Sequence, residues 1–369
     1  MQGKLRIAIA GTGFGEQYLI GLKALPEVEV VGVYSRRPER AAALAERYGV
    51  PYSTRHLHVL LGLPGLDAVA VVTPNSTHAE FVEAALEAGK HVICDKPLAL
   101  NSEEGARLVT LAEARRLRHV TFVPYRFSPA SVAIKEAIAE GQIGRILRVK
   151  ASWGIDLRDE PLRWRFQRRL SGPGVVADLG AHLLDLLSWW AGPIRRVLGR
   201  LRTLVPQRPA EVGGRLRPVD VPDECWALLE FGAAGVGSLS LSWNGKRDQR
   251  VEVEGERGTL IYESPSLLQW LAGKGAFTPS VTLVSAGEAG RAQALRLPGS
   301  ERFRTQETAL AHMLGEITGY LRGGPRPDTV ASFREGWEVL RAIDAIVASD
   351  EREQWAAVAQ ETGAATEGS

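Results

Sequence analysis

Apolar and polar residues follow two different rhythms along the first third of the chain. Short runs rich in β-branched residues predict strands, and each is followed by a longer alanine- and leucine-rich stretch with helical spacing. The predicted strands are Leu5–Ala10, Val28–Tyr34, Asp67–Thr73, His91–Cys94 and His119–Pro124. The predicted helices are Gly15–Leu25, Pro38–Tyr48, Thr77–Ala88 and Ser102–Leu117. Strands that alternate with helices in this way predict an α/β domain built on a doubly wound parallel sheet.

The pattern changes after Arg126. One further predicted helix, Pro129–Ala139, precedes strands with only short turns between several of them: Leu147–Trp153, Cys225–Phe231, Val236–Trp243, Gln249–Glu254 and Thr259–Tyr262. Successive strands of this kind predict a C-terminal α+β domain with a large, mostly antiparallel, open sheet. We therefore expect two domains, residues 1–124 and 125–369.

Three stretches complete the prediction for the second domain. Apolar residues recur at helical spacing within Ser332–Ala348, which predicts a final helix that packs back on the body of the protein. Pro206–Pro222 is rich in proline and glycine and predicts a long loop. The small and polar residues 361–369 are expected to be frayed.

Composition narrows the classes of function. The formal net charge is +2, with 45% hydrophobic and 24% charged residues, which is typical of a globular protein and argues against nucleic acid or a membrane surface as partner. The two cysteines, Cys94 and Cys225, cannot form a disulfide framework. With no signal-peptide pattern and no apolar run of about 18 residues, we expect a cytoplasmic protein.

A glycine-rich turn joins the first predicted strand to the first predicted helix. Its residues are Gly11, Thr12, Gly13, Phe14 and Gly15. Glycines at this place allow a tight turn and a close approach of the backbone to a pyrophosphate, so the turn predicts a dinucleotide site. Glu16 stands where the third glycine of the usual pattern is expected. A tight turn that binds nothing remains the alternative.

The end of the second predicted strand bears on the choice of cofactor. An enzyme that uses NAD usually presents a carboxylate there, about 20 residues past the glycines. This chain instead has Ser35, Arg36 and Arg37, with no carboxylate before Glu39. A hydroxyl and guanidinium groups suit a 2′-phosphate, which predicts NADP, with NAD still possible. Solvated surface arginines are the alternative.

Two further strand ends carry polar side chains toward the edge of the sheet where ligands bind in such folds. The first is the segment that contains Thr73, Pro74, Asn75 and His78. The second is Asp95-Lys96-Pro97, in which the proline disfavours helical geometry at the lysine. A lysine held extended there can donate to a substrate hydroxyl or carbonyl. An ordinary solvated lysine is the alternative.

A second group of titratable residues lies near the middle of the chain. Asp178, His182 and Asp185 share one face if a helix begins near Asp178, which places an imidazole beside carboxylates. Alternatively, Asp178 is a helix N-cap and His182 a packed residue. A metal site would need a further ligand, and because the sequence nominates none we expect no metal.

Together these motifs resemble the Gfo/Idh/MocA oxidoreductase family, the group of glucose-fructose oxidoreductase and inositol dehydrogenase. The likeness runs from the glycine-rich turn through Thr73-Pro74-Asn75, Lys96-Pro97 and Trp164-Arg165 to the segment Gly172–Asp185. The chain departs from the family pattern at Glu16, which adds a negative charge near the pyrophosphate, at Asp95, where glutamate is commoner, and at Pro173, where the family has glycine.

The resemblance implies a Rossmann domain followed by an α/β domain whose open sheet often makes dimer or tetramer contacts. It implies that Lys96 lies between nicotinamide and substrate, that Asp178 and His182 complete the catalytic site, and that Asn75 and His78 line the cofactor cleft. Trp164 and Arg165 would shape the pocket, although such a pair is also an ordinary packing element.

The expected activity is an NAD(P)-dependent oxidation of a secondary alcohol of a sugar, cyclitol or related polyol, or the reverse reduction. His182 would take the hydroxyl proton directly or through Lys96, while Asp178 orients the site. An NAD-dependent glycosidase and a non-catalytic NAD(P)-sensing regulator are the alternatives. Trp226 and Trp243 are expected on an apolar face of the second sheet that is buried in a homodimer or homotetramer.

Overall fold

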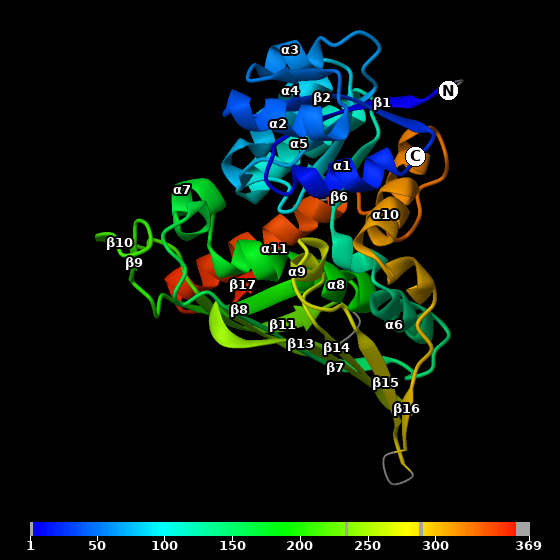
Figure 1. Cartoon of the computed structure of the whole chain (residues 1–369). Helices are drawn as coiled ribbons and strands as arrows, with labels where there is room; N and C mark the ends of the chain where they lie inside the picture. Colours follow the sequence, from blue (N-terminus) through cyan, green and yellow to red (C-terminus); the bar gives the residue numbers. More distant parts are fainter. Residues whose placement is uncertain (1–2, 233–234, 288–290, 359–369) are drawn as a thin grey trace, which may run out of the picture.

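A computed structural model describes residues 3–232, 235–287 and 291–358, apart from the side chains of 246–247 (Figure 1). The end expected to be frayed, 361–369, lies outside the described residues. The described chain contains two large sheets, an upper one formed by the N-terminal part of the chain and a lower one formed by the C-terminal part (Figure 1).

The first sheet has the strand order β3-β2-β1-β4-β5-β6, and all of its pairings are parallel. Its strands are β1 (Leu5–Ala10), β2 (Val28–Tyr34), β3 (Tyr52–Thr54), β4 (Ala68–Val71), β5 (His91–Asp95) and β6 (His119–Phe122). The order reverses between β1 and β4, and the crevice at such a reversal is where doubly wound sheets bind ligands.

The helices α1 (Gly15–Lys23), α2 (Pro38–Tyr48), α4 (His78–Glu87) and α5 (Ser102–Ala114) connect these strands, as predicted. The prediction missed β3 and the short α3 (Leu57–Leu61). Because β3 has only three residues, two of them exposed, it carries no apolar run that a pattern search detects.

The second sheet has the strand order β16-β15-β14-β13-β7-β12-β11-β8-β17. Its strands are β7 (Ile146–Asp156), β8 (Ile194–Arg202), β11 (Glu224–Phe231), β12 (Val236–Ser242), β13 (Asn244–Gly255), β14 (Gly258–Ser264), β15 (Ser280–Ser285), β16 (Ala292–Ala294) and β17 (Ala356–Ala357). Among the described strands of this second sheet, only β7 and β12 pair in parallel, which confirms a large, mostly antiparallel sheet. The sequence prediction missed β8, β15, β16 and β17.

Helices cover one face of this second sheet. They include α6 (Pro129–Ala139), α8 (Ala181–Ala191), α9 (Leu267–Leu271) and the predicted final helix, α11 (Phe333–Arg352) (Figure 1). The helix α10 (Gln306–Leu321), which was not predicted, packs on α1, and α11 packs on α5. These two contacts fasten the end of the chain to the N-terminal sheet domain.

The opposite face of the second sheet carries exposed apolar side chains. Trp226, Leu228 and Val236 are 45%, 49% and 56% exposed. Trp243 was expected beside them, and this expectation is wrong, since its side chain is fully buried in the core. Trp243 follows the last residue of β12, where the alternation of the strand no longer assigns a face.

The predicted loop Pro206–Pro222 contains a small antiparallel hairpin, formed by β9 (Gln207–Pro209) and β10 (Leu216–Pro218). Its strands are too short to show a period in the sequence. Elsewhere in the described chain, no helix combines the length and the apolar character that a bilayer crossing requires.

Candidate active site

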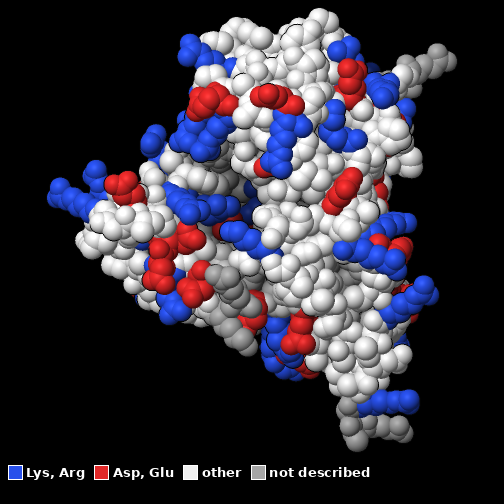
Figure 2. Space-filling view, viewed as in Figure 1, with Lys and Arg blue, Asp and Glu red and all other residues white. Residues whose placement is uncertain are grey.

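A cleft of about 1100 Å³ lies at the carboxyl ends of the first sheet's strands and reaches the second domain. Figure 2 shows the hollow between the two parts of the molecule, with Lys and Arg side chains on both sides of it. Its lining residues come from the glycine-rich turn, the ends of β2, β4 and β5, and the segments around Trp164, Asp178 and Trp243.

The glycine-rich turn leaves room for a pyrophosphate at one wall of this cleft. Gly11 has φ +125° and a Cβ placed on it would lie 2.2 Å from the backbone oxygen of Val72, so only glycine fits there. A Cβ on Gly13 would meet no atom within 4 Å, because it would project into open space at the cleft. Gly15 is buried at the start of α1 and does not line the cleft. The turn therefore fits the close approach of a dinucleotide phosphate.

Glu16 raised the concern of a negative charge beside that phosphate. In the structure its carboxylate accepts hydrogen bonds from Arg47 Nη1 at 2.6 Å and from Tyr48 Oη at 2.9 Å. Both partners belong to α2 or its end. The charge is thus compensated by an arginine, and Glu16 does not line the cleft.

The end of β2 forms the far end of the cleft. Thr12 Oγ1 donates to Ser35 Oγ at 3.3 Å, and the same oxygen accepts the backbone N–H of Arg37 at 3.2 Å. The cleft is lined here by Ser35, Arg36, Arg37 and Arg40. Sequence reasoning missed Arg40, although it lies in the same arginine-rich stretch.

The segment after β4 is held by hydrogen bonds to other parts of the cleft. Asn75 Nδ2 donates to the backbone oxygen of Ser171 at 3.0 Å. The buried His78 ring lies between two carbonyl oxygens, Pro97 O at 2.7 Å from Nδ1 and Thr73 O at 2.8 Å from Nε2. Burial lowers the pKa of His78. These contacts tie the ends of β4 and β5 together and fix the cleft wall.

Lys96 crosses the cleft to the second domain. Its Nζ donates to the backbone oxygen of Asp178 at 2.8 Å and to Asp178 Oδ1 at 3.2 Å. Arg165 Nε lies 3.7 Å from Asp178 Oδ2. Burial alone would raise the pKa of Asp178, but Lys96 and Arg165 outweigh it and the pKa is lowered. The carboxylate is therefore ionised between two cations, and Lys96 is no solvated surface lysine.

His182 lies behind this group. Its imidazole has no exposed surface, and it packs edge-on against Tyr125 with ring centroids 4.9 Å apart and against Trp153 at 5.6 Å. Neither ring nitrogen has a hydrogen-bond partner among the described residues. Burial, and then the charge of Lys96, hold the pKa of His182 well below its usual value. The imidazole is neutral and does not line the cleft.

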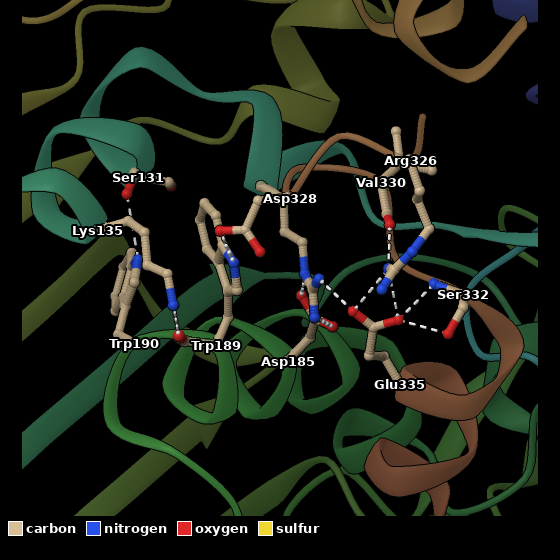
Figure 3. A network of polar contacts seen from close by, with 11 residues as sticks. Ser131, Lys135, Asp185, Trp189, Trp190, Arg326, Asp328, Val330, Ser332 and Glu335 are labelled. Atoms are coloured by element: carbon tan, nitrogen blue, oxygen red, sulfur yellow. Dashed lines mark hydrogen bonds and ion pairs between the residues drawn. The ribbon is translucent and has the colours of Figure 1, made fainter. Parts of the chain in front are cut away.

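Asp185 does not contact His182, contrary to the expectation that a shared helical face places the imidazole beside both carboxylates. Its two carboxylate oxygens accept from Arg126 Nε at 2.7 Å and Nη2 at 2.8 Å. Figure 3 shows Asp185 on one side of this network and Glu335, with Arg326 and Ser332, on the other. Asp178 lies in a π-helical turn, Val176–Gly180, so the helix begins before it, and Asp178 is no N-cap.

The structure brings most of the predicted site residues into the one cleft. These are Gly11, Thr12, Gly13, Phe14, Ser35, Arg36, Thr73, Pro74, Asn75, His78, Asp95, Lys96, Trp164, Arg165 and Asp178. Gly15 and His182 lie outside it. Trp243 and Ser171 line the cleft but were not predicted as site residues. Within the described chain, no group of three or more His, Cys, Asp or Glu residues is arranged to hold a metal ion.

Comparison with known proteins agrees with this geometry. Residues 5–122 match the model of an oxidoreductase family with an NAD-binding Rossmann fold, and residues 131–261 match a GFO/IDH/MocA C-terminal domain. Levoglucosan dehydrogenase of Pseudarthrobacter phenanthrenivorans is 30% identical over 91% of each chain. Myo-inositol 2-dehydrogenase of Thermotoga maritima is 28% identical, over 70% of this chain and 75% of that one.

Solved structures extend the likeness over nearly the whole chain. A levoglucosan dehydrogenase in complex with NADH and L-sorbose superposes with a TM-score of 0.86 at 28% identity, covering 97% of this chain and 99% of the other. The protein therefore belongs to the GFO/IDH/MocA family of oxidoreductases with an NAD-binding Rossmann fold.

Proposed function

We propose that this protein is an NAD(P)-dependent dehydrogenase that acts on a secondary alcohol of a sugar, cyclitol or related polyol, or reduces the matching ketone. The contact between Lys96 and Asp178 carries the proposal, because it joins the end of β5 to the second domain inside the cleft. The names of the relatives, levoglucosan dehydrogenase and myo-inositol 2-dehydrogenase, support the substrate class.

Lys96 is suited to hold the reacting oxygen. An ammonium group has three donors, and Lys96 uses its contacts with the backbone and side chain of Asp178 for two of them. The third is available to a substrate hydroxyl or carbonyl. The nicotinamide, when bound, supplies or accepts the hydride. The two contacts with Asp178 hold Lys96 Nζ in the cleft.

Oxidation of an alcohol also releases the hydroxyl proton, and a group near Lys96 must take it. His182 is neutral and close enough for the charge of Lys96 to lower its pKa. Because its ring has no exposed surface, His182 would receive the proton through Lys96, and this requires a contact with Nζ that neither ring nitrogen makes in the structure. Trp164 and Arg165 would form the wall against the substrate and nicotinamide.

NADP is the proposed preferred cofactor, with NAD also accepted. Support comes from Arg36, Arg37 and Arg40, which line the end of the cleft beside Ser35. The relative with NADH bound shows that NAD use occurs in this family. One charge-assisted hydrogen bond contributes about 1.5 to 3 kcal/mol, or roughly tenfold or more in affinity. We expect Arg36→Ala to lose at least tenfold in NADP affinity and to leave NAD affinity unchanged.

Fluorescence titration with both reduced cofactors tests this preference. Arg107→Ala, on the exposed side of α5, is the control for loss of a cation far from the cleft. Equal affinity of the wild type for NAD and NADP, or an equal loss of both cofactors in the Arg36 variant, would contradict the proposal.

We also propose a cytoplasmic homodimer or homotetramer formed through the exposed face of the second sheet. Trp226, Leu228 and Val236 are large apolar side chains on that face, and burial against a second copy removes them from water. Light scattering should show an oligomer at micromolar concentration and a smaller species for Trp226→Glu. Val212→Glu, at an exposed residue between β9 and β10, is the control. A wild-type monomer would contradict the proposal.

The proposed activity is tested with a panel of levoglucosan, myo-inositol, D-xylose and L-sorbose, each with NAD and with NADP. Formation of reduced nicotinamide at 340 nm, in proportion to the sugar consumed, supports a net dehydrogenase. Cleavage of a glycoside without accumulation of reduced cofactor would favour the glycosidase alternative. Tight cofactor binding without turnover of any sugar, polyol or ketone would favour the non-catalytic sensor.

A further inference from the structure

The segment 206–222 is hydrogen-bonded to the part of the chain that lines the substrate end of the cleft. In Figure 1 its strands β9 and β10 lie beside the short helix α7 (Arg168–Ser171). The backbone N–H of Leu162 donates to Pro209 O at 2.7 Å, and that of Arg168 donates to Asp220 Oδ1 at 2.6 Å. Between these two contacts lies the short helix η3 (Trp164–Phe166), whose Trp164 and Arg165 line the cleft.

Arg208 is the centre of this attachment. Its side chain is buried, with the residue only 1% exposed, and Nη1 donates to the backbone oxygens of Leu157, Arg158 and Glu160. A buried cation of this kind is costly unless its donors are satisfied, and the backbone carbonyls of one loop satisfy Nη1, whereas Nε and Nη2 have no hydrogen-bond partner among the described residues.

The same guanidinium also contacts the helix that carries the cleft residues. It lies 3.9 Å above the ring centroid of Phe166, the last residue of η3. The Phe166 ring packs edge-on against Trp243 at 5.4 Å, and Trp243 lines the cleft. Arg208 therefore fixes both the start of the loop, through its carbonyls, and the end of η3, through Phe166.

We propose that Arg208 is a positioning residue for the substrate end of the cleft. By holding Leu157–Glu160 and Phe166 in place, it sets where Trp164 and Arg165 stand, and Arg165 in turn faces the carboxylate of Asp178. Arg208 itself is absent from the cleft lining. The kinetic test of this proposal rests on the proposed function. The structural test rests on the contacts alone.

The variant Arg208→Met removes the donors and the charge but keeps an unbranched apolar side chain. Arg217→Met is the matched control, because Arg217 pairs with Arg208 across the β9–β10 hairpin and is exposed. Arg208→Lys retains a cation that can donate to carbonyls but lacks the planar group that stacks on Phe166, so we expect an intermediate effect.

The first measurement is limited trypsin digestion with mass spectrometry. Arg158, Arg163, Arg168 and Arg169 are exposed arginines in the held segment, so its local opening is read as cleavage at these residues. We expect Arg208→Met to be cut there at least tenfold faster than the wild type and Arg217→Met to be cut at the wild-type rate. Cleavage of Arg208→Met at the wild-type rate would overturn the proposal.

The second measurement compares two ends of the same cleft. With the sugar of the panel that gives the highest kcat/KM, we expect kcat/KM of Arg208→Met to fall at least tenfold. The affinity for 2′-phospho-ADP-ribose, which reaches only the glycine-rich turn and the Arg36 end, should stay within twofold. Unchanged kcat/KM, or an equal loss of 2′-phospho-ADP-ribose binding, would overturn the positioning role. If no sugar is turned over, the digestion result still decides the attachment, and the failure counts against the proposed function.

Discussion

The buried ion pair between Arg126 and Asp185 makes a strong prediction about stability. Their side chains are 3% and 1% exposed, and two hydrogen bonds of 2.7 and 2.8 Å join them. Arg126 Nη1 also donates to Glu335 Oε1 at 3.1 Å. The variant Arg126→Met leaves a carboxylate of Asp185 buried without its cation, whereas Glu335 keeps Arg326 and Ser332 (Figure 3).

The magnitude follows from the burial of both partners. Removing one partner of a buried pair costs about 3 to 5 kcal/mol. Burial already raises the pKa of Asp185, against the lowering effect of Arg126, so the isolated carboxyl becomes protonated and the cost stays near the lower part of that range. For a chain of 369 residues that unfolds cooperatively, with about 2 cal/mol/K of unfolding entropy per residue, this loss corresponds to about 4 to 6 °C in Tm.

Urea denaturation and thermal scanning at pH 7 measure the effect. The double variant Arg126→Met, Asp185→Leu removes both charges and should recover at least half of the loss. Arg196→Met is the control, because its pair with Glu230 at 3.3 Å is exposed and such pairs contribute about 0 to 1 kcal/mol. A loss below about 1 kcal/mol in Arg126→Met, or a double variant no more stable than the single one, would refute this reasoning.

Two further predictions concern pH and the glycine-rich turn. Burial lowers the pKa of His119 from 6.5 to about 4. Its neutral form therefore stabilises the fold above pH 6.5. This contribution to the free energy of unfolding, about 3 kcal/mol at most, is lost as the pH falls from 6.5 toward 4. Because Phe333 N–H donates to His119 Nδ1, His119→Gln keeps an acceptor, and its Tm should fall less steeply over this range than that of the wild type; parallel curves would count against the assignment. Gly11→Ala should lose both Tm and cofactor affinity because its Cβ would meet Val72, whereas Gly13→Ala should keep the wild-type Tm and lose at least tenfold in affinity. Calorimetry and cofactor titration separate the two glycines, and a Gly13→Ala variant with intact affinity would place the phosphate elsewhere.

The sequence predicts those parts of the fold that depend on local periodicity. The strands β1, β2 and β5 and the helix α2 coincide closely with their apolar patterns, because the strands are nearly continuous buried runs and the buried alanines of the helix are four residues apart. The short β3 escapes prediction because its three residues contain no repeat. The strand pattern predicted that Lys96 lies at a strand end. The family resemblance predicted that Lys96 and Asp178 belong to one site.

The errors at Asp185 and Glu16 share one cause, which is a partner distant in the sequence. The face that Asp185 shares with His182 was read from helical spacing, but the spacing cannot reveal that Arg126, 59 residues away, binds the carboxylate. Glu16 was read as a charge beside a phosphate because Arg47 and Tyr48 are 31 and 32 residues away. The role of Arg208 is equally invisible, since it depends on carbonyl groups of a loop about 50 residues earlier.

The central claim is that Lys96 holds the reacting oxygen in a cleft where nicotinamide and a sugar meet. The most direct test is the variant Lys96→Met, assayed for turnover of the best sugar of the panel and titrated with reduced cofactor. We predict that kcat falls by at least a thousandfold while the Kd of the cofactor changes by less than threefold, because Lys96 contacts Asp178 and the substrate side of the cleft, away from the glycine-rich turn. Turnover within tenfold of the wild type would contradict the claim.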